Sequence, residues 1–166
     1  MAKLTSKQVI LPTTTQCEDW SVKFEFNING SLQNRVHPTW SNILGFTADV
    51  PYGQAGYRQP HVYVRDGARA QDVIVGIRAQ LGTSNNWGAG KTDYTVTRNE
   101  WHSIEIEQQN GWYSVRIDGD KRLSIRNMQP KKFEKITGYT CASDQFDCGV
   151  GMFRNLETEF DKCVSK

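Results

Sequence analysis

Two irregular segments of the chain, residues 49–60 and 82–91, hold aromatic side chains beside amide and guanidinium groups. An exposed Trp or Tyr ring offers a flat apolar surface to the C–H face of a sugar, and nearby polar groups bind its hydroxyls. Binding groups also gather on long loops carried by a rigid scaffold. The candidate carbohydrate-binding residues are Tyr52, Tyr57, Arg58, His61, Asn85, Asn86 and Trp87. We expect Trp87 and Tyr57 to stack on the ligand.

Acidic residues form two pairs at a spacing of two, Glu105 with Glu107 and Glu157 with Glu159. Retaining glycoside hydrolysis needs two carboxyl groups about 5–5.5 Å apart. On a strand, residues spaced by two share one face at about 6–7 Å. We interpret both pairs as the solvated outer face of strands. With no G-x-S-x-G, C-x-x-C or Ser/His/Asp arrangement, the sequence favours a non-catalytic protein.

The elements that position these residues are predicted most clearly in the segment 101–127. Asn110-Gly111 and Asp118-Gly119 both suit hairpin turns, because Asn, Asp and Gly tolerate positive φ. Between the turns, apolar and polar residues alternate, so that Ile104, Ile106, Val115 and Ile117 should face a core. The same alternation occurs in residues 21–28, where Val22, Phe24, Phe26 and Ile28 should point inward.

Strand-like runs separated by turn residues recur along the whole chain, whereas helical periodicity does not persist. The predicted strands are 7–11, 21–28, 42–48, 61–65, 73–80, 92–97, 103–108, 113–118, 121–125, 135–141 and 150–160, the last with a break at Asn155. Such regular spacing is typical of an all-β sandwich or barrel. No repeat, low-complexity tract or linker is present, so residues 1–166 are expected to form a single domain.

The charge balance restricts the partners. With 20 Lys and Arg against 18 Asp and Glu, and no concentrated basic stripe, the sequence does not indicate a nucleic-acid partner. No apolar run approaches the ~18 residues that span a bilayer. The first ten residues contain no signal-peptide core, so a secreted form would have lost its leader. The oligomeric state cannot be predicted.

The four cysteines allow three pairings, and their spacing fits no zinc site. We expect Cys141–Cys148, which closes a short loop, together with Cys17–Cys163, which ties the two chain ends. Disulfides would indicate a secreted, extracellular protein; the alternative is four reduced cysteines in the cytosol. Asn29-Gly30-Ser31 is a glycosylation sequon in a predicted turn, compatible with secretion.

The sequence resembles the concanavalin A-like lectin and glucanase superfamily, in particular its LamG-like and galectin-like members. The resemblance is carried by Trp101-His102-Ser103-Ile104-Glu105-Ile106, Tyr113-Ser114-Val115-Arg116-Ile117-Asp118-Gly119 and Gly151-Met152-Phe153-Arg154-Asn155-Leu156, with Trp20–Phe26 as the entry strand. It implies an antiparallel β-sandwich, a jelly roll of two stacked sheets, in which Trp101 closes an edge of the core. First and last strands are neighbours in such folds, which suits the pairing Cys17–Cys163.

The resemblance also bears on the ligand. Galectins carry a His-x-Asn-x-Arg set before a Trp-Gly step and a Glu two residues after that Trp. This chain keeps His61 and Arg65 at that spacing, has Tyr63 in the Asn position, and has Ala89 in the Glu position. A secreted lectin-like module for a glycan other than a β-galactoside is therefore the favoured hypothesis. The alternatives are an adhesion or receptor-type domain with a protein partner and, less favoured, a glycoside hydrolase.

Calcium is the one cofactor that the resemblance suggests, because LamG-like relatives often bind one ion at a rim. The candidate ligands are Asp66, Asp72 and Asp144. No D-x-D-x-D-G loop is present, so we expect these carboxylates to be solvated loop residues and the protein to need no cofactor.

Overall fold

The structure, a computed structural model of the chain, describes residues 2–3, 7–30, 32, 40–48, 50, 54–81, 93–141, 147–148, 150–161 and 163. These residues form two β-sheets and no helix. There is accordingly no helix among them long and apolar enough to cross a membrane.

Sheet A contains six strands in the order β1-β13-β3-β8-β9-β10. Their bounds are β1 Ala2–Lys3, β3 Trp20–Ile28, β8 His102–Gln109, β9 Trp112–Ile117, β10 Asp120–Arg126 and β13 Gly151–Glu159. All neighbouring strands in this sheet are antiparallel.

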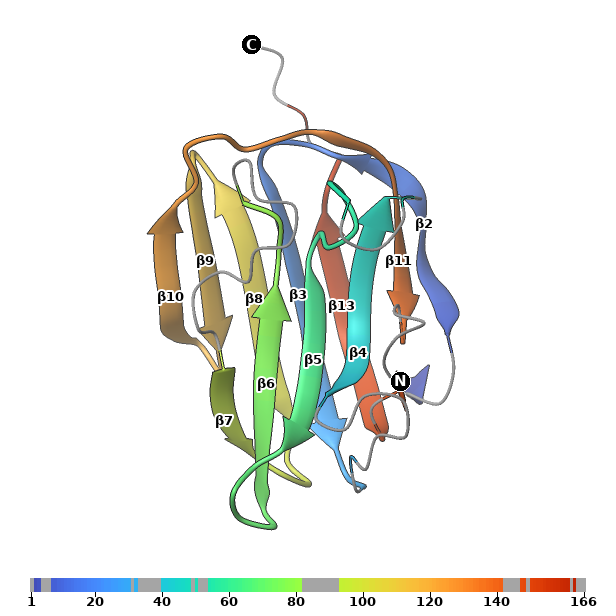
Figure 1. The fold of residues 1–166 in the computed structure, drawn as a ribbon, viewed down its shortest axis with the longest axis vertical. Helices are drawn as coiled ribbons and strands as arrows, with labels where there is room; N and C mark the ends of the chain where they lie inside the picture. Colours follow the sequence, from blue (N-terminus) through green and yellow to red (C-terminus); the bar gives the residue numbers. More distant parts are fainter. Residues whose placement is uncertain are drawn as a thin grey trace.

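Sheet B has the order β2-β11-β4-β5-β6-β7, with the short β12 paired in parallel to β4. Its strands are β2 Gln8–Gln16, β4 Ser41–Ala48, β5 His61–Asp66, β6 Asp72–Arg78, β7 Asp93–Thr97, β11 Phe133–Thr140 and β12 Asp147–Cys148. Figure 1 shows β4 to β7 in front of β3, β8, β9 and β13, so the two sheets form a sandwich. The all-β jelly-roll prediction is confirmed, and each predicted strand overlaps an observed one.

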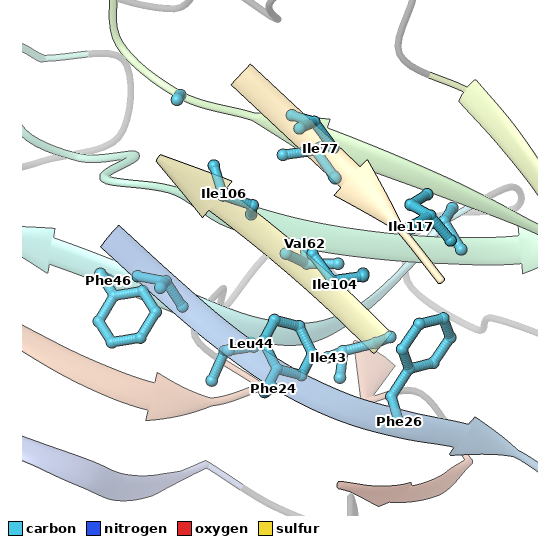
Figure 2. Close-up of a cluster of buried hydrophobic side chains, with 14 of the residues drawn as sticks. Phe24, Phe26, Ile43, Leu44, Phe46, Val62, Ile77, Ile104, Ile106 and Ile117 are labelled. Carbon is cyan, nitrogen blue, oxygen red and sulfur yellow. The ribbon is translucent and has the colours of Figure 1, made fainter. Parts of the chain in front are cut away.

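The core lies between the two sheets and is built by the alternation seen in the sequence. Val22, Phe24 and Phe26 of β3 are fully buried, as are the predicted inward residues of β8 and β9. Sheet B contributes Leu44, Phe46, Val62, Val64, Val73, Val75 and Ile77 from the opposite side. Figure 2 shows Leu44, Phe46, Val62 and Ile77 of sheet B together with Phe24, Phe26, Ile104, Ile106 and Ile117 of sheet A. The alternate residues point to the outer faces of the sheets and carry most of the polar groups, although β4 and most of β5 are buried on both faces.

The predicted turns and the predicted break are confirmed. Asn110 and Gly111 have φ of 50° and 75°, and Asp118 and Gly119 have φ of 54° and 80°. Two successive positive φ values match the twist of the flanking strands. In β13, Asn155 has φ of 53°, and the register with β3 shifts between Arg154 and Glu157, which is the signature of a β-bulge.

The tryptophan of the core is Trp20, which is 6% exposed and packs against Tyr113 and Phe160. Trp101, expected to close a core edge, is only partly buried at the start of β8. The guanidinium carbon of Arg154 lies 4.0 Å from the centre of its ring. Replacing Trp20 should therefore cost more stability than replacing Trp101, because a large cavity forms only when a buried side chain is removed.

Two disulfides are present, Cys17–Cys163 and Cys141–Cys148. Their Cα–Cα distances are 5.2 Å and 5.0 Å, within the usual range for such bonds. The first closes the chain ends against each other, and the Cys17 amide also donates to the carbonyl of Phe160 at 2.8 Å. Both predicted pairings are thus found. Disulfides of this kind are typical of extracellular proteins.

Candidate functional site

The outer face of sheet B carries an indole ring that closely approaches the neighbouring strands. Trp40 immediately precedes β4, and its ring covers Gly76 of β6, so that it extends across the intervening strand β5. A Cβ atom at Gly76 would come within 2.8 Å of Cη2 and Cζ3 of this ring. Glycine inside a strand commonly marks such a close approach. The absence of a side chain at Gly76 therefore leaves the room that the Cη2–Cζ3 edge of the indole occupies.

Guanidinium groups flank this indole. The guanidinium carbons of Arg65 and Arg78 lie 4.9 Å and 5.9 Å from the ring centre of Trp40. Both arginines reach the carboxylate of Asp93, with N–O distances of 3.5 Å and 3.6 Å. Stacking on an aromatic ring leaves the edges of a guanidinium group able to donate hydrogen bonds. Within the described residues, Nε of Arg65 is buried and makes no hydrogen bond.

The strand register explains why these side chains meet. Tyr63 of β5 is opposite Gly76 of β6, and Gly76 is opposite Asp93 of β7. Residues two apart on a strand share a face. Arg65, two residues after Tyr63, and Arg78, two residues after Gly76, therefore lie on the same outer face of sheet B. A hollow of about 70 Å³ lies among Trp40, Arg58, Tyr63, Gly76 and Arg78.

A third guanidinium group, that of Arg58, completes this set, with its carbon 5.7 Å from the ring centre of Tyr63. Arg58 is only 8% exposed, and its carbonyl accepts a hydrogen bond from the amide of Gln80 at 3.0 Å. The side chain of Gln80 accepts from the amide of Gly56 at 2.7 Å and from Nε2 of Gln59 at 3.2 Å. These buried hydrogen bonds hold the segment 54–60 against the end of sheet B, and with it the position of Arg58.

His61 lies beneath this surface. It is fully buried, its Nδ1 is 3.0 Å from the hydroxyl of Tyr63, and its ring centre is 5.2 Å from that of Tyr57. Burial, and secondly the positive charge of Arg58, lower the pKa of His61 to about 3. The imidazole is thus neutral at physiological pH. Its position suits orientation of the Tyr63 hydroxyl better than direct contact with a ligand.

We call the group Trp40, Arg58, Tyr63, Arg65, Arg78 and Asp93 the Trp40 cluster. Of the residues predicted to bind a ligand, Arg58 belongs to it, and Tyr57 and His61 pack behind it. Tyr52, Asn85, Asn86 and Trp87 lie outside the described residues. Trp40 was not among the predicted binding residues, because no local sequence pattern around it indicates such a role. Gly76 inside the strand pattern of residues 73–80 was the available signal.

The carboxylates considered as calcium ligands are engaged by arginines. Asp72 accepts hydrogen bonds from Arg69 at 2.9 Å and 3.1 Å, and Asp66 pairs with Arg98. Asp144 lies outside the described residues. Where the structure describes the chain, no three His, Cys, Asp or Glu residues are grouped to hold a metal ion.

Asn29, the acceptor of the glycosylation sequon, is exposed directly after β3. Its backbone amide donates to the carbonyl of Val150 at 3.3 Å. The location therefore suits a glycan, and its presence stays a prediction.

Comparison with known proteins identifies the fold. No protein-family profile and no curated protein matches the chain. Among solved structures, it is similar to a heptameric SAP-like pentraxin from Limulus polyphemus, at 9% identity and a TM-score of 0.56, over 94% of this chain and 70% of that one. It is also similar to an alginate lyase from Klebsiella pneumoniae, at 9% identity and a TM-score of 0.56, over 87% of this chain and 60% of that one.

A third similar structure is the binding domain of botulinum neurotoxin serotype D, at 16% identity and a TM-score of 0.55, over 98% of this chain but 39% of that one. The chain thus spans between 39% and 70% of these three proteins. At such identities the likeness establishes the fold alone: a concanavalin A-like jelly roll, as the sequence resemblance implied.

Proposed function

We propose that this chain is an extracellular, non-catalytic carbohydrate-binding module whose ligand contacts the Trp40 cluster. The observation that carries the proposal is the Trp40 indole resting on Gly76 between Arg65 and Arg78. The ring is a flat apolar surface of the kind that accepts the C–H face of a sugar, and rigid strands hold it in place. The alginate lyase with the same fold acts, by its name, on alginate.

The charges of the cluster favour a sugar with a carboxylate or sulfate group. Arg58, Arg65 and Arg78 bring three guanidinium groups together, and the described contacts place one carboxylate, Asp93, against two of them. Guanidinium groups bind carboxylates and sulfates through paired hydrogen bonds. His61 is neutral and adds no charge. An acidic glycan would therefore meet guanidinium groups beside the Trp40 ring.

The test is a glycan array with acidic and neutral oligosaccharides, read with calcium and again with a chelator, followed by titration calorimetry on the hits. Trp40→Ala should weaken binding of acidic glycans by roughly tenfold or more, since an aromatic contact is worth about 1 kcal/mol beyond its buried area. Trp112→Ala is the matched control, because Trp112 lies on sheet A and is exposed. Arg65→Gln with Arg78→Gln should abolish the preference for acidic over neutral sugars.

The outcomes separate the alternatives. No hit on the array in either condition would refute carbohydrate binding. A pull-down from extracellular extract that survives excess free sugar would favour a protein partner. Trp87→Ala should also weaken binding if the segment 82–91 contributes as the sequence predicts. A free-thiol assay on the native protein should find none, as expected for an extracellular chain with both disulfides formed.

A further inference from the structure

The outer face of sheet A has a row of serine and glutamate side chains that runs across the strands. Successive register pairs join Glu159 of β13, Ser21 of β3, Glu107 of β8, Ser114 of β9 and Ser124 of β10. Three of the five are serines. With strands about 4.8 Å apart, the row is about 19 Å long from β13 to β10. That length suits a short oligosaccharide rather than a single sugar.

Longer side chains stand on both sides of this row. One flanking row consists of Glu157, Lys23, Glu105, Arg116 and Lys121. The other contains Gln109, Trp112 and Arg126. The serine row is therefore the floor of a groove, which we call the serine groove. Two hollows of about 330 Å³ and 420 Å³ lie along it, and both border Glu107 and Gln109, so they are neighbours.

The groove has an aromatic wall. Trp112 is 47% exposed, and the guanidinium carbon of Arg126 lies 5.4 Å from the centre of its ring. An exposed large aromatic side chain in a hollow marks a binding site more often than an isolated surface position does. Around it, Gln109, Asn110 and the two serines Ser114 and Ser124 line the same hollow with hydrogen-bonding groups.

The polar groups of the floor are already oriented. The hydroxyl of Ser114 donates to Oε1 of Glu107 at 2.7 Å, which fixes that carboxylate while its other lone pairs stay available. The adjoining hollow is lined by Ser21 and Gln109, which bring a further hydroxyl and a further amide to it. Fixed carboxylates and amides beside an aromatic ring are the groups that recognise sugar hydroxyls.

The charge of the groove selects the kind of sugar. Asp19, Glu105, Glu107 and Glu159 line the two hollows, where Lys121 is the one cation among the lining residues that the structure describes. Of the cations in the flanking rows, Arg116 pairs with Glu105 at 3.7 Å and Arg126 stacks on Trp112. Like charges would repel a uronate or a sulfated chain. We infer that the serine groove binds a linear oligosaccharide without acidic groups, with one sugar stacked on Trp112. This site is separate from the Trp40 cluster, because the two lie on opposite sheets.

The experiment measures binding of non-acidic oligosaccharides of increasing length to the native chain by calorimetry. Affinity should rise with length until the groove is filled. Ser124→Tyr fills the groove without removing a hydrogen bond recorded for that side chain. Ser103→Tyr is its matched control, because Ser103 is on the same outer face and strand system but lines neither hollow. Thermal midpoints and circular dichroism verify that both variants fold.

Ser124→Tyr and Trp112→Ala should each weaken binding by roughly tenfold or more, while Ser103→Tyr stays within about twofold of the native chain. Binding of acidic glycans to the Trp40 cluster should be unchanged in all three variants, which keeps this inference distinct from the proposed function. The inference is overturned if no non-acidic oligosaccharide binds the native chain, or if Ser124→Tyr binds one as tightly as the native chain does.

Discussion

Substitution of Gly76 by alanine tests directly whether Trp40 rests on β6. The new Cβ would lie 2.8 Å from the indole, whereas ordinary contact begins at 3.4 Å, so the ring must move by about 0.6 Å. Overpacking of this kind costs about 1–3 kcal/mol where nothing can yield. Trp40 is partly exposed and can tilt outward, so we expect a cost near the lower end of this range. Against this, alanine restricts the unfolded chain and contributes about 0.4–1 kcal/mol of stability.

The double-mutant cycle with Trp40→Ala separates the two effects. In the native background Gly76→Ala should destabilise the protein in urea denaturation. In the Trp40→Ala background the same change should stabilise it by about 0.4–1 kcal/mol, because the clash is gone and the entropic gain remains. Gly76→Ala should also alter tryptophan fluorescence and weaken the binding of acidic glycans. An effect of the same sign and size in both backgrounds would show that Trp40 does not pack on Gly76.

Two further predictions concern stability. Loss of Cys17–Cys163, with a separation of 146 residues, should reduce the free energy of unfolding by about 5 kcal/mol, and loss of Cys141–Cys148, with a separation of 7, by about 2.5 kcal/mol, because the longer loop has more entropy to lose. Urea denaturation of the two double Cys→Ser variants measures both losses. Equal losses would contradict this order. Because the pKa of His61 falls to about 3 in the folded state, stability should drop as the pH decreases from about 6.5 toward 3, by up to about 5 kcal/mol. The pH dependence of the urea midpoint across this range should flatten in His61→Gln. The chain has three histidines, so the His61 signal is identified as the imidazole signal that His61→Gln lacks, and its titration near pH 6.5 in the native protein would disprove the burial.

The strands could be predicted from the sequence because each buries one face. In β3, β8 and β9 most inward residues are apolar, with His102 and Gln108 as polar exceptions at the two ends of β8, and the turns between β8, β9 and β10 use residues that tolerate positive φ. The bulge at Asn155 was also visible in the sequence, as a predicted break in the strand 150–160. Local physical rules therefore determine these elements, and no knowledge of distant contacts is needed.

The Trp40 cluster could not be predicted in this way. Trp40, Gly76 and Arg78 are brought together only by the strand order β4-β5-β6, which local patterns do not specify. The burial of His61 could not be predicted from local patterns either. Alternation places it on the outward face of β5, where a ligand could reach it, but the segment 54–60 covers it completely. Its burial depends on hydrogen bonds between residues far apart in the sequence, such as Gln59 with Gln80.

The chain is nearly neutral overall, but the outer faces of its two sheets carry different charged groups. Sheet B presents guanidinium groups around Trp40, and sheet A presents carboxylates along the serine groove. Stacked sheets are about 10 Å apart, so a hydrophobic core separates these faces and one sugar cannot contact both. Distant sites without shared partners act independently. If both faces bind glycans, saturation with a non-acidic oligosaccharide should therefore leave the affinity for an acidic one unchanged, and competition between them would place both ligands on one face.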